Sequence, residues 1–92
     1  METRSIFVEV LEWHDKTCGN SYWSSRVWVN GEVAFQLPFQ YGYENHGLSV
    51  CVNELEKRDY LPATTKSIRE LGIDFYYTKK PALRREMFKE LN

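Results

Sequence analysis

The chain has 92 residues, of which 42% are hydrophobic and 15% are aromatic. These proportions are typical of a folded globule and argue against an intrinsically disordered chain. A formal net charge of −1 argues against a polycation that binds nucleic acid through its overall charge. We therefore expect one domain over residues 1–92, with little room for an enzyme pocket inside its core.

We expect no signal peptide, because the first residues lead directly into a strand-like segment. No apolar run approaches the roughly 20 residues that are needed to cross a bilayer. The cysteines, Cys18 and Cys51, have no secretory context and are expected to stay reduced. These features predict a cytoplasmic protein that does not enter membranes.

Three strand-like segments, residues 5–13, 22–29 and 32–39, occupy the first half of the chain. The first alternates between two faces, with Ile6, Val8 and Val10 on one and Phe7, Leu11 and Trp13 on the other. The second and third are joined by Asn30 and Gly31. Asn-Gly predicts a hairpin, because both residues tolerate the positive φ of a type I′ turn.

The hairpin turn also predicts how its two strands pair. The expected pairs are Val29 with Glu32, Trp28 with Val33, Val27 with Ala34, and Arg26 with Phe35. One face would then carry Tyr22, Trp28, Val33, Phe35 and Leu37 with Arg26, and the other Trp23, Val27, Val29 and Ala34 with Glu32 and Gln36. A small sheet needs one face for its core, so the other is expected to be open to solvent or to a partner.

Helical periodicity begins after the turn-rich connector at residues 40–47. The apolar residues with helical spacing are Leu48, Cys51, Val52 and Leu55. This first helix is expected to stop at Tyr60-Leu61-Pro62. A second, short helix is expected from Thr64 or Thr65 to Leu71, with Gly72 as its C-terminal stop.

A fourth strand and a last helix are expected near the C-terminus. Residues 73–78 are rich in aromatic and β-branched side chains, which favours a strand. Pro81 suits the first turn of a helix whose apolar stripe is Leu83, Met87 and Leu91, flanked by Phe88. The order is therefore β-β-β-α-α-β-α, which predicts an α+β domain with a mainly antiparallel sheet and helices on one face.

Two His/Cys pairs are the candidate metal ligands: His14 with Cys18, and His46 with Cys51. Four such ligands could hold tetrahedral zinc. The alternative is that His14, Cys18 and His46 are loop residues and Cys51 fills the core. No tight C-x2-C knuckle, catalytic-cysteine signature, HExxH, P-loop, GxGxxG or serine elbow is present. We therefore expect no metal, no cofactor and no enzymatic activity.

Aromatic side chains are concentrated around the predicted hairpin and the Tyr41-Gly42-Tyr43 segment. Tryptophan and tyrosine supply large contact areas at low entropic cost, which is typical of protein-binding surfaces. The expected protein-binding residues are Trp23, Arg26, Trp28, Tyr41 and Tyr43. The alternative is that these rings fill the small core.

A second hypothesis is that the chain binds single-stranded nucleic acid by stacking bases on rings and gripping phosphates. Its candidate residues are Tyr76, Tyr77, Lys79, Lys80, Arg84, Arg85 and Lys89. The alternative is that the basic cluster is the solvated face of a helix, because Glu86 and Glu90 lie among the bases.

The string DKTCGNSYWSSRVWVNGE followed by PFQYGY forms a pattern of turn-forming and aromatic residues. On this pattern the chain resembles a set of short proteins encoded by tailed bacteriophages. The matching positions are Asp15, Lys16, Gly19, Asn20, Ser21, Tyr22, Ser25, Arg26, Val27, Asn30, Gly31, Pro38, Phe39, Tyr41, Gly42 and Tyr43. The resemblance covers about the first half of the chain and continues weakly to Tyr60-Leu61-Pro62. It departs at Glu44 and Asn45, where those proteins often have a second glycine.

The resemblance implies a phage origin and no particular activity, because the family has none assigned. With the small size, negative charge and aromatic content, it predicts an accessory protein in the bacterial cytoplasm that binds a host protein as inhibitor or adaptor, for example against host defence. Nucleic-acid binding is the alternative. A weaker one is a virion or assembly component that self-associates through an edge strand.

Overall fold

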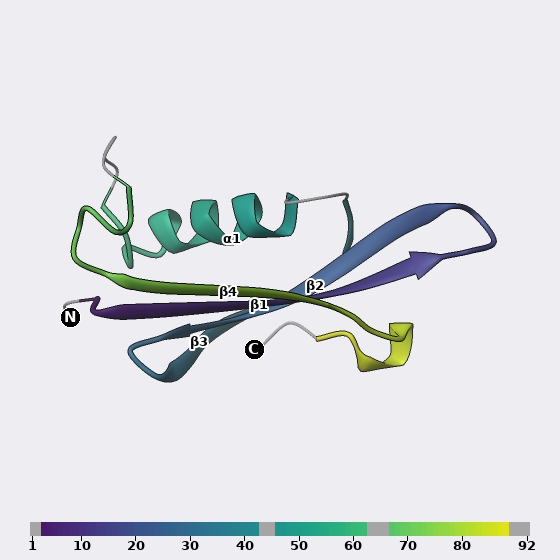
Figure 1. Ribbon diagram of the computed structural model, residues 1–92, viewed down its shortest axis with the longest axis horizontal. Helices are drawn as coiled ribbons and strands as arrows, with labels where there is room; N and C mark the ends of the chain where they lie inside the picture. Colours follow the sequence, from purple (N-terminus) through teal and green to yellow (C-terminus); the bar gives the residue numbers. More distant parts are fainter. Residues whose placement is uncertain (1–2, 43–45, 63–66, 89–92) are drawn as a thin grey trace.

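A long, twisted sheet with an α-helix lying along one face forms the body of the molecule (Figure 1). The computed structural model describes residues 3–42, 46–62 and 67–88, apart from the side chain of Glu86. Within these residues the elements in chain order are β1 (Ser5–Asp15), β2 (Asn20–Val29), β3 (Glu32–Tyr41), α1 (His46–Lys57), β4 (Asp74–Pro81) and a 3₁₀ turn, η1 (Arg84–Glu86).

The strands lie in the order β3-β2-β1-β4, which puts the first strand of the chain inside the sheet. β1 pairs antiparallel with β2, and β2 pairs antiparallel with β3. β4 instead pairs parallel with β1. A parallel pair needs a crossover of a dozen or more residues, and α1 provides it by carrying the chain back over one face (Figure 1). The sheet is therefore mixed, and the predicted α+β class is confirmed.

The expected order with three helices is wrong, because the described residues contain one α-helix. Thr64 and Thr65 lie outside the described residues, and the chain from Ile68 to Gly72 forms turns. In the described part of this segment, the N–H groups of Leu71 and Gly72 donate to the carbonyls of Ile68 and Arg69, three residues earlier, which is the hydrogen bonding of tight turns. Gly72, with φ 76°, takes the left-handed conformation of a turn that directs the chain into β4.

The last predicted helix is replaced by a longer strand and a short turn. β4 continues to Pro81, and η1 covers only Arg84–Glu86. Ion pairs lie between the end of β4 and β1: Lys79 Nζ is 3.7 Å from Glu12 Oε2, and Lys80 Nζ is 3.6 Å from Glu9 Oε2. The chain then turns across the sheet, where Met87 is buried. Leu91 lies outside the described residues.

The core lies between α1 and one face of the sheet. Its buried hydrophobic residues are Ile6, Val8, Val10, Trp23, Val27, Val29, Phe35, Cys51, Leu55, Leu61 and Ile73. Inside it, the thiol of Cys51 donates a hydrogen bond to Ser25 Oγ at 3.1 Å, which satisfies a buried hydroxyl between α1 and β2. The predicted face of Ile6, Val8 and Val10 is thus the core face of β1.

The hairpin has the predicted turn but a different register beyond its second pair. Asn30 and Gly31 have φ angles of 53° and 84°, and Trp28 lies opposite Val33 as expected. A β-bulge then places Phe35, in place of Ala34, opposite Val27. Phe35 consequently points into the core. Leu37 moves to that face as well, because it pairs with Ser25, while Gln36 moves to the opposite face.

Candidate functional site

The face of the sheet that α1 leaves uncovered carries a row of aromatic and polar side chains. Successive strand residues point to opposite faces, so these side chains alternate with those of the core. The cross-strand pairs on this face, in order along β1, are Phe7 with Trp28, Glu9 with Arg26, Leu11 with Ser24, and Trp13 with Tyr22. We call it the helix-free face. It is divided into three zones along the strands.

The zone beside the Asn30-Gly31 turn contains an apolar hollow of about 320 Å³, which we call the hairpin-end hollow. It is lined by Ser5, Ile6, Phe7, Trp28, Gly31 and Tyr76. The rings of Phe7 and Trp28 meet edge to face with centroids 5.2 Å apart, which fixes one wall. Tyr76, which is 60% exposed, comes from β4. Because none of the lining residues is charged, the hollow suits an apolar side chain.

The middle zone is a polar belt. Lys80 Nζ lies 3.6 Å from Glu9 Oε2, and Arg26 Nε donates a hydrogen bond to Gln36 Oε1. The guanidinium of Arg26 also lies 5.6 Å from the centroid of Trp28, the ring that lines the hollow. The belt therefore gives the apolar hollow a polar border along one side.

The far zone is a cluster of stacked rings at the other end of the sheet. Tyr22 stacks on Phe39 with centroids 4.6 Å apart, and Trp13 stacks on Tyr22 at 5.7 Å. Tyr41 meets Tyr22 edge to face. The guanidinium of Arg84 lies over Trp13 and Phe39, at 5.7 and 5.3 Å from their centroids. Arg84 thus already occupies the faces that these two rings would offer to a partner.

Residues 84–88 run over the helix-free face from the far zone to the middle zone, and we call them the C-terminal strap (Figure 1). The backbone N–H of Phe88 donates to Ser24 Oγ at 2.8 Å. The ring of Phe88 lies under the guanidinium of Arg26, at 4.4 Å. The strap therefore covers the middle of this face, and among the described residues it leaves the hairpin-end hollow open.

The five residues predicted to bind a protein do not form one surface. Trp23 is only 2% exposed and belongs to the core, so its prediction as a contact residue is corrected. Arg26 and Trp28 contact each other between the belt and the hollow. Tyr41 is 54% exposed but lies in the far zone. Tyr43 lies outside the described residues.

Two residues that were not predicted to be part of this surface belong to it. Phe7 and Tyr76 line the hollow with Trp28. The signal for Phe7 was present in the alternation of residues 5–13, which put it opposite the core face. Tyr76 could not be placed beside Phe7 from sequence, because that requires knowing that β4 pairs parallel with β1.

The residues predicted to bind nucleic acid are divided between the two faces and engaged in other contacts. Tyr76 faces the hollow, whereas the adjacent Tyr77 packs against the core on the helix side. Lys79 and Lys80 pair with carboxylates of β1. Arg84 lies over rings, Arg85 is exposed, and Lys89 lies outside the described residues. The two tyrosines do not make the joint stacking platform that was expected.

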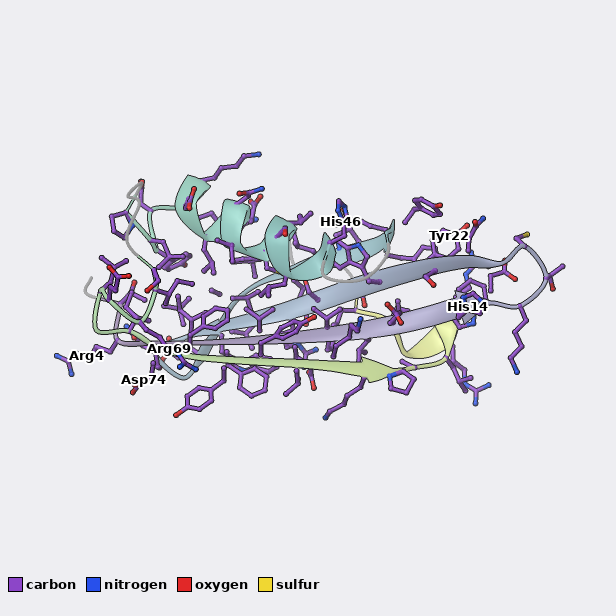
Figure 2. All side chains as sticks on the ribbon, turned by 45° about the horizontal axis from the view of Figure 1, so that its top comes forward. Arg4, His14, Tyr22, His46, Arg69 and Asp74 are labelled. Atoms are coloured by element: carbon purple, nitrogen blue, oxygen red, sulfur yellow. The ribbon has the colours of Figure 1, made fainter. Side chains whose placement is uncertain are left out.

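The four candidate metal ligands are not brought together. His46 packs against the Trp23 ring at the start of α1, while Cys51 is buried beneath the helix. His14 Nδ1 lies 3.1 Å from Ser21 Oγ, at a different place on the sheet (Figure 2). Among the described residues, no group of three His, Cys, Asp or Glu side chains could hold a metal ion.

The two thiols lack the environment of an activated nucleophile. Burial raises the pKa of Cys51. Cys18 is exposed in the β1–β2 turn, and its hydrogen bond to the Asp15 carboxylate raises the pKa of this thiol. A reactive cysteine needs the opposite shift, toward the thiolate.

The described helix, α1, is neither long enough nor apolar enough to cross a membrane. Comparison with protein-family models, with curated proteins and with solved structures finds no match. Candidate functions are therefore distinguished by the surface described above.

Proposed function

We propose that this protein is a non-enzymatic accessory protein of the tailed-bacteriophage type, which binds a host protein in the bacterial cytoplasm as an inhibitor or adaptor. The observation that carries the proposal is the hairpin-end hollow. Aromatic side chains form it on a sheet face that α1 does not cover. The resemblance of the first half of the chain to phage proteins supports a host protein as the partner.

The hollow has the composition of an interface hot spot. Tyrosine and tryptophan side chains in a small pocket contribute about 2 kcal/mol or more to binding when a partner buries them. The polar belt of Glu9, Arg26, Gln36 and Lys80 lies beside it, as polar residues surround the apolar centre of a typical interface. We therefore expect the partner to insert an apolar side chain into the hollow and to contact the belt with polar groups.

The state of the thiols supports a non-enzymatic role. Catalysis by Cys18 or Cys51 would need a lowered pKa, and both pKa values are raised. The ring of His46 packs against Trp23 instead of approaching Cys51 as a general base would.

A matched pair of tyrosines allows a sharp test of this surface. Tyr76 on β4 and Tyr41 on β3 both lie on edge strands and on the helix-free face, with similar exposure but at opposite ends. Tagged wild-type, Tyr76→Ser and Tyr41→Ser proteins are incubated with nuclease-treated bacterial lysate, and captured proteins are quantified by mass spectrometry. We expect a stoichiometric host protein whose recovery falls about tenfold or more with Tyr76→Ser and is kept by Tyr41→Ser.

Equal recovery by wild type and Tyr76→Ser would show that the hollow is not the binding site. Loss with Tyr41→Ser alone would place the site in the far zone instead. The wild-type protein is also incubated with untreated lysate. Capture seen only in that untreated sample would overturn protein binding in favour of the nucleic-acid alternative.

A further inference from the structure

The two edge strands of the sheet differ in how well they can accept another strand. β3 contains Pro38, and its pairing with β2 has two register irregularities. Such features disrupt an edge and discourage further pairing. β4 pairs with β1 in unbroken register from Asp74 to Pro81, and no strand of the described residues lies beyond it. β4 therefore presents the regular edge of this sheet.

The hydrogen bonds at the two ends of β4 establish which backbone groups face this edge. The N–H of Asp74 donates to the Arg4 carbonyl at 3.0 Å, and the N–H of Ala82 donates to the Glu12 carbonyl at 2.8 Å. Backbone groups of successive strand residues point alternately to the two sides. The even-numbered residues thus point toward β1, while Phe75 and Tyr77 direct their N–H and C=O groups outward.

A second copy of the chain can bond to these outward N–H and C=O groups with its own β4. The two strands then pair antiparallel about a two-fold axis perpendicular to the sheet. Such an axis keeps the same face of both copies on the same side. Even-numbered residues then lie opposite even-numbered ones, and odd-numbered residues opposite odd-numbered ones. Three centres near the middle of the strand satisfy the hydrogen bonding. Tyr77 can face the second copy's Tyr77 as a bonded pair, or Tyr76 or Thr78 can face its own equivalent as a non-bonded pair.

Charge complementarity selects the register centred on Tyr77. In that register Asp74 lies directly opposite the second copy's Lys80, and symmetry repeats this pair at the other end of the strand. Asp74 would face Thr78 in the register centred on Tyr76 and Ala82 in the register centred on Thr78, so no opposite charges would meet in either. Opposite charges directly across antiparallel strands stabilise the pairing. From this pattern we propose that two copies form a dimer through β4, joining their sheets into one.

The surface beside β4 has room for such a contact. A hollow of about 330 Å³ lies at the start of the strand and is lined by Arg69, Gly72, Ile73, Asp74, Phe75 and Tyr76. Asp74 is the carboxylate in this lining, and Figure 2 shows it at the end of the molecule near Arg69. The Lys80 side chain is 62% exposed beside Glu9, so it can turn toward a carboxylate on a second copy.

Charge reversal tests this register without truncating a core side chain. Asp74→Lys would place Lys opposite Lys80 twice, and Lys80→Glu would place Glu opposite Asp74 twice. Sedimentation velocity of the purified full chain, from about 1 μM to about 1 mM, is expected to show a concentration-dependent dimer for wild type. Each single variant is expected to dimerise about tenfold or more weakly.

The decisive sample is an equimolar mixture of the Asp74→Lys and Lys80→Glu proteins. In the heterodimer each lysine again faces a carboxylate, so the mixture is expected to dimerise about as tightly as the wild type, which neither variant does alone. Lys16→Glu, a charge reversal in the exposed β1–β2 turn, is the matched control and is expected to keep the wild-type dimer.

A wild-type protein that stays monomeric over this range would overturn the proposal. A single reversal that leaves the dimer as tight as the wild type's, or a mixture that dimerises no more tightly than the single variants, would overturn the Tyr77-centred register and with it the proposed pairing. Loss of the dimer with Lys16→Glu would show that net charge, not the β4 register, controls association. The proposed dimer is independent of host binding, because it is measured on the purified chain with no host protein present.

Discussion

The backbone N–H of Phe88 donates a hydrogen bond of 2.8 Å to the side-chain oxygen of Ser24, and this contact fastens the C-terminal strap to the middle of the sheet. The same hydroxyl lies 3.7 Å from the sulfur of Met87, toward which it can donate. Ser24 is fully buried between β1 and β3. One small hydroxyl therefore contacts two consecutive residues of the strap.

Ser24→Ala is expected to loosen the strap. The Phe88 N–H would lose its acceptor while partly buried, so we expect the free energy of unfolding to fall by about 1–2 kcal/mol. Urea denaturation followed by circular dichroism measures this loss, and limited proteolysis should show earlier cleavage within residues 84–88. Ser49→Ala, at an exposed position of α1, is the control and should change stability by less than about 0.5 kcal/mol. Unchanged protection of the strap in Ser24→Ala would contradict this anchoring role.

Trp23→Ala is expected to unfold the protein or bring it close to unfolding. Truncating a buried tryptophan costs about 3–5 kcal/mol, which is a large part of the stability of a small domain. Tyr41→Ala removes a half-exposed ring and should cost only about 1 kcal/mol. Thermal unfolding of the two variants measures the contrast. A Trp23→Ala protein with wild-type stability would show that this ring is not part of the core.

Asp59→Gly is expected to stabilise the end of α1. Asp59 has φ 63°, and the N–H groups of Asp59 and Tyr60 donate to the carbonyls of Glu56 and Leu55. This pattern is a Schellman cap, whose left-handed position favours glycine. We expect a gain of about 0.5–1 kcal/mol in chemical denaturation. Asn53→Gly, inside α1, should lower stability, and a gain there too would point to a cause other than the cap.

Asp15→Asn is expected to speed alkylation of Cys18. The hydrogen bond from the Cys18 thiol to the Asp15 carboxylate favours the neutral thiol and raises its pKa. Without the negative charge that pKa falls, so more thiolate exists at about pH 8 and iodoacetamide reacts faster. The rate measured against pH should therefore shift toward lower pH. Glu32→Gln, an exposed charge removal on β3, should leave the profile unchanged; an equal shift there would contradict the local cause.

Local signals in the sequence were sufficient where a turn preference or the spacing of apolar residues decides the structure. Asn30 and Gly31 take the positive φ angles of the predicted turn. The alternation of residues 5–13 identified the core face of β1, with Val8 fully buried at its centre. Helical spacing located α1, whose Cys51 and Leu55 are buried as the pattern required.

Features that depend on distant contacts could not be predicted in the same way. The bulge beside Ala34 inserts a residue that no turn rule specifies, and it moved Phe35 into the core. Trp23 was assigned to a binding surface because residue type alone does not distinguish a core ring from an exposed one. The position of the strap could not be predicted from the sequence, because the residue that anchors it, Ser24, lies 64 residues away and gives no local signal.

The parallel pairing of β4 with β1 also imposes an order on folding during synthesis. The N–H of Asp74 bonds to the carbonyl of Arg4, so one side of β1 finds its partner only after most of the chain has left the ribosome. Until then β1, β2 and β3 can form their two antiparallel pairs, and the edge of β1 that later pairs with β4 has no partner strand. Nascent chains that stall before residue 74 should therefore be captured by chaperones that bind extended segments, and release should coincide with the arrival of β4.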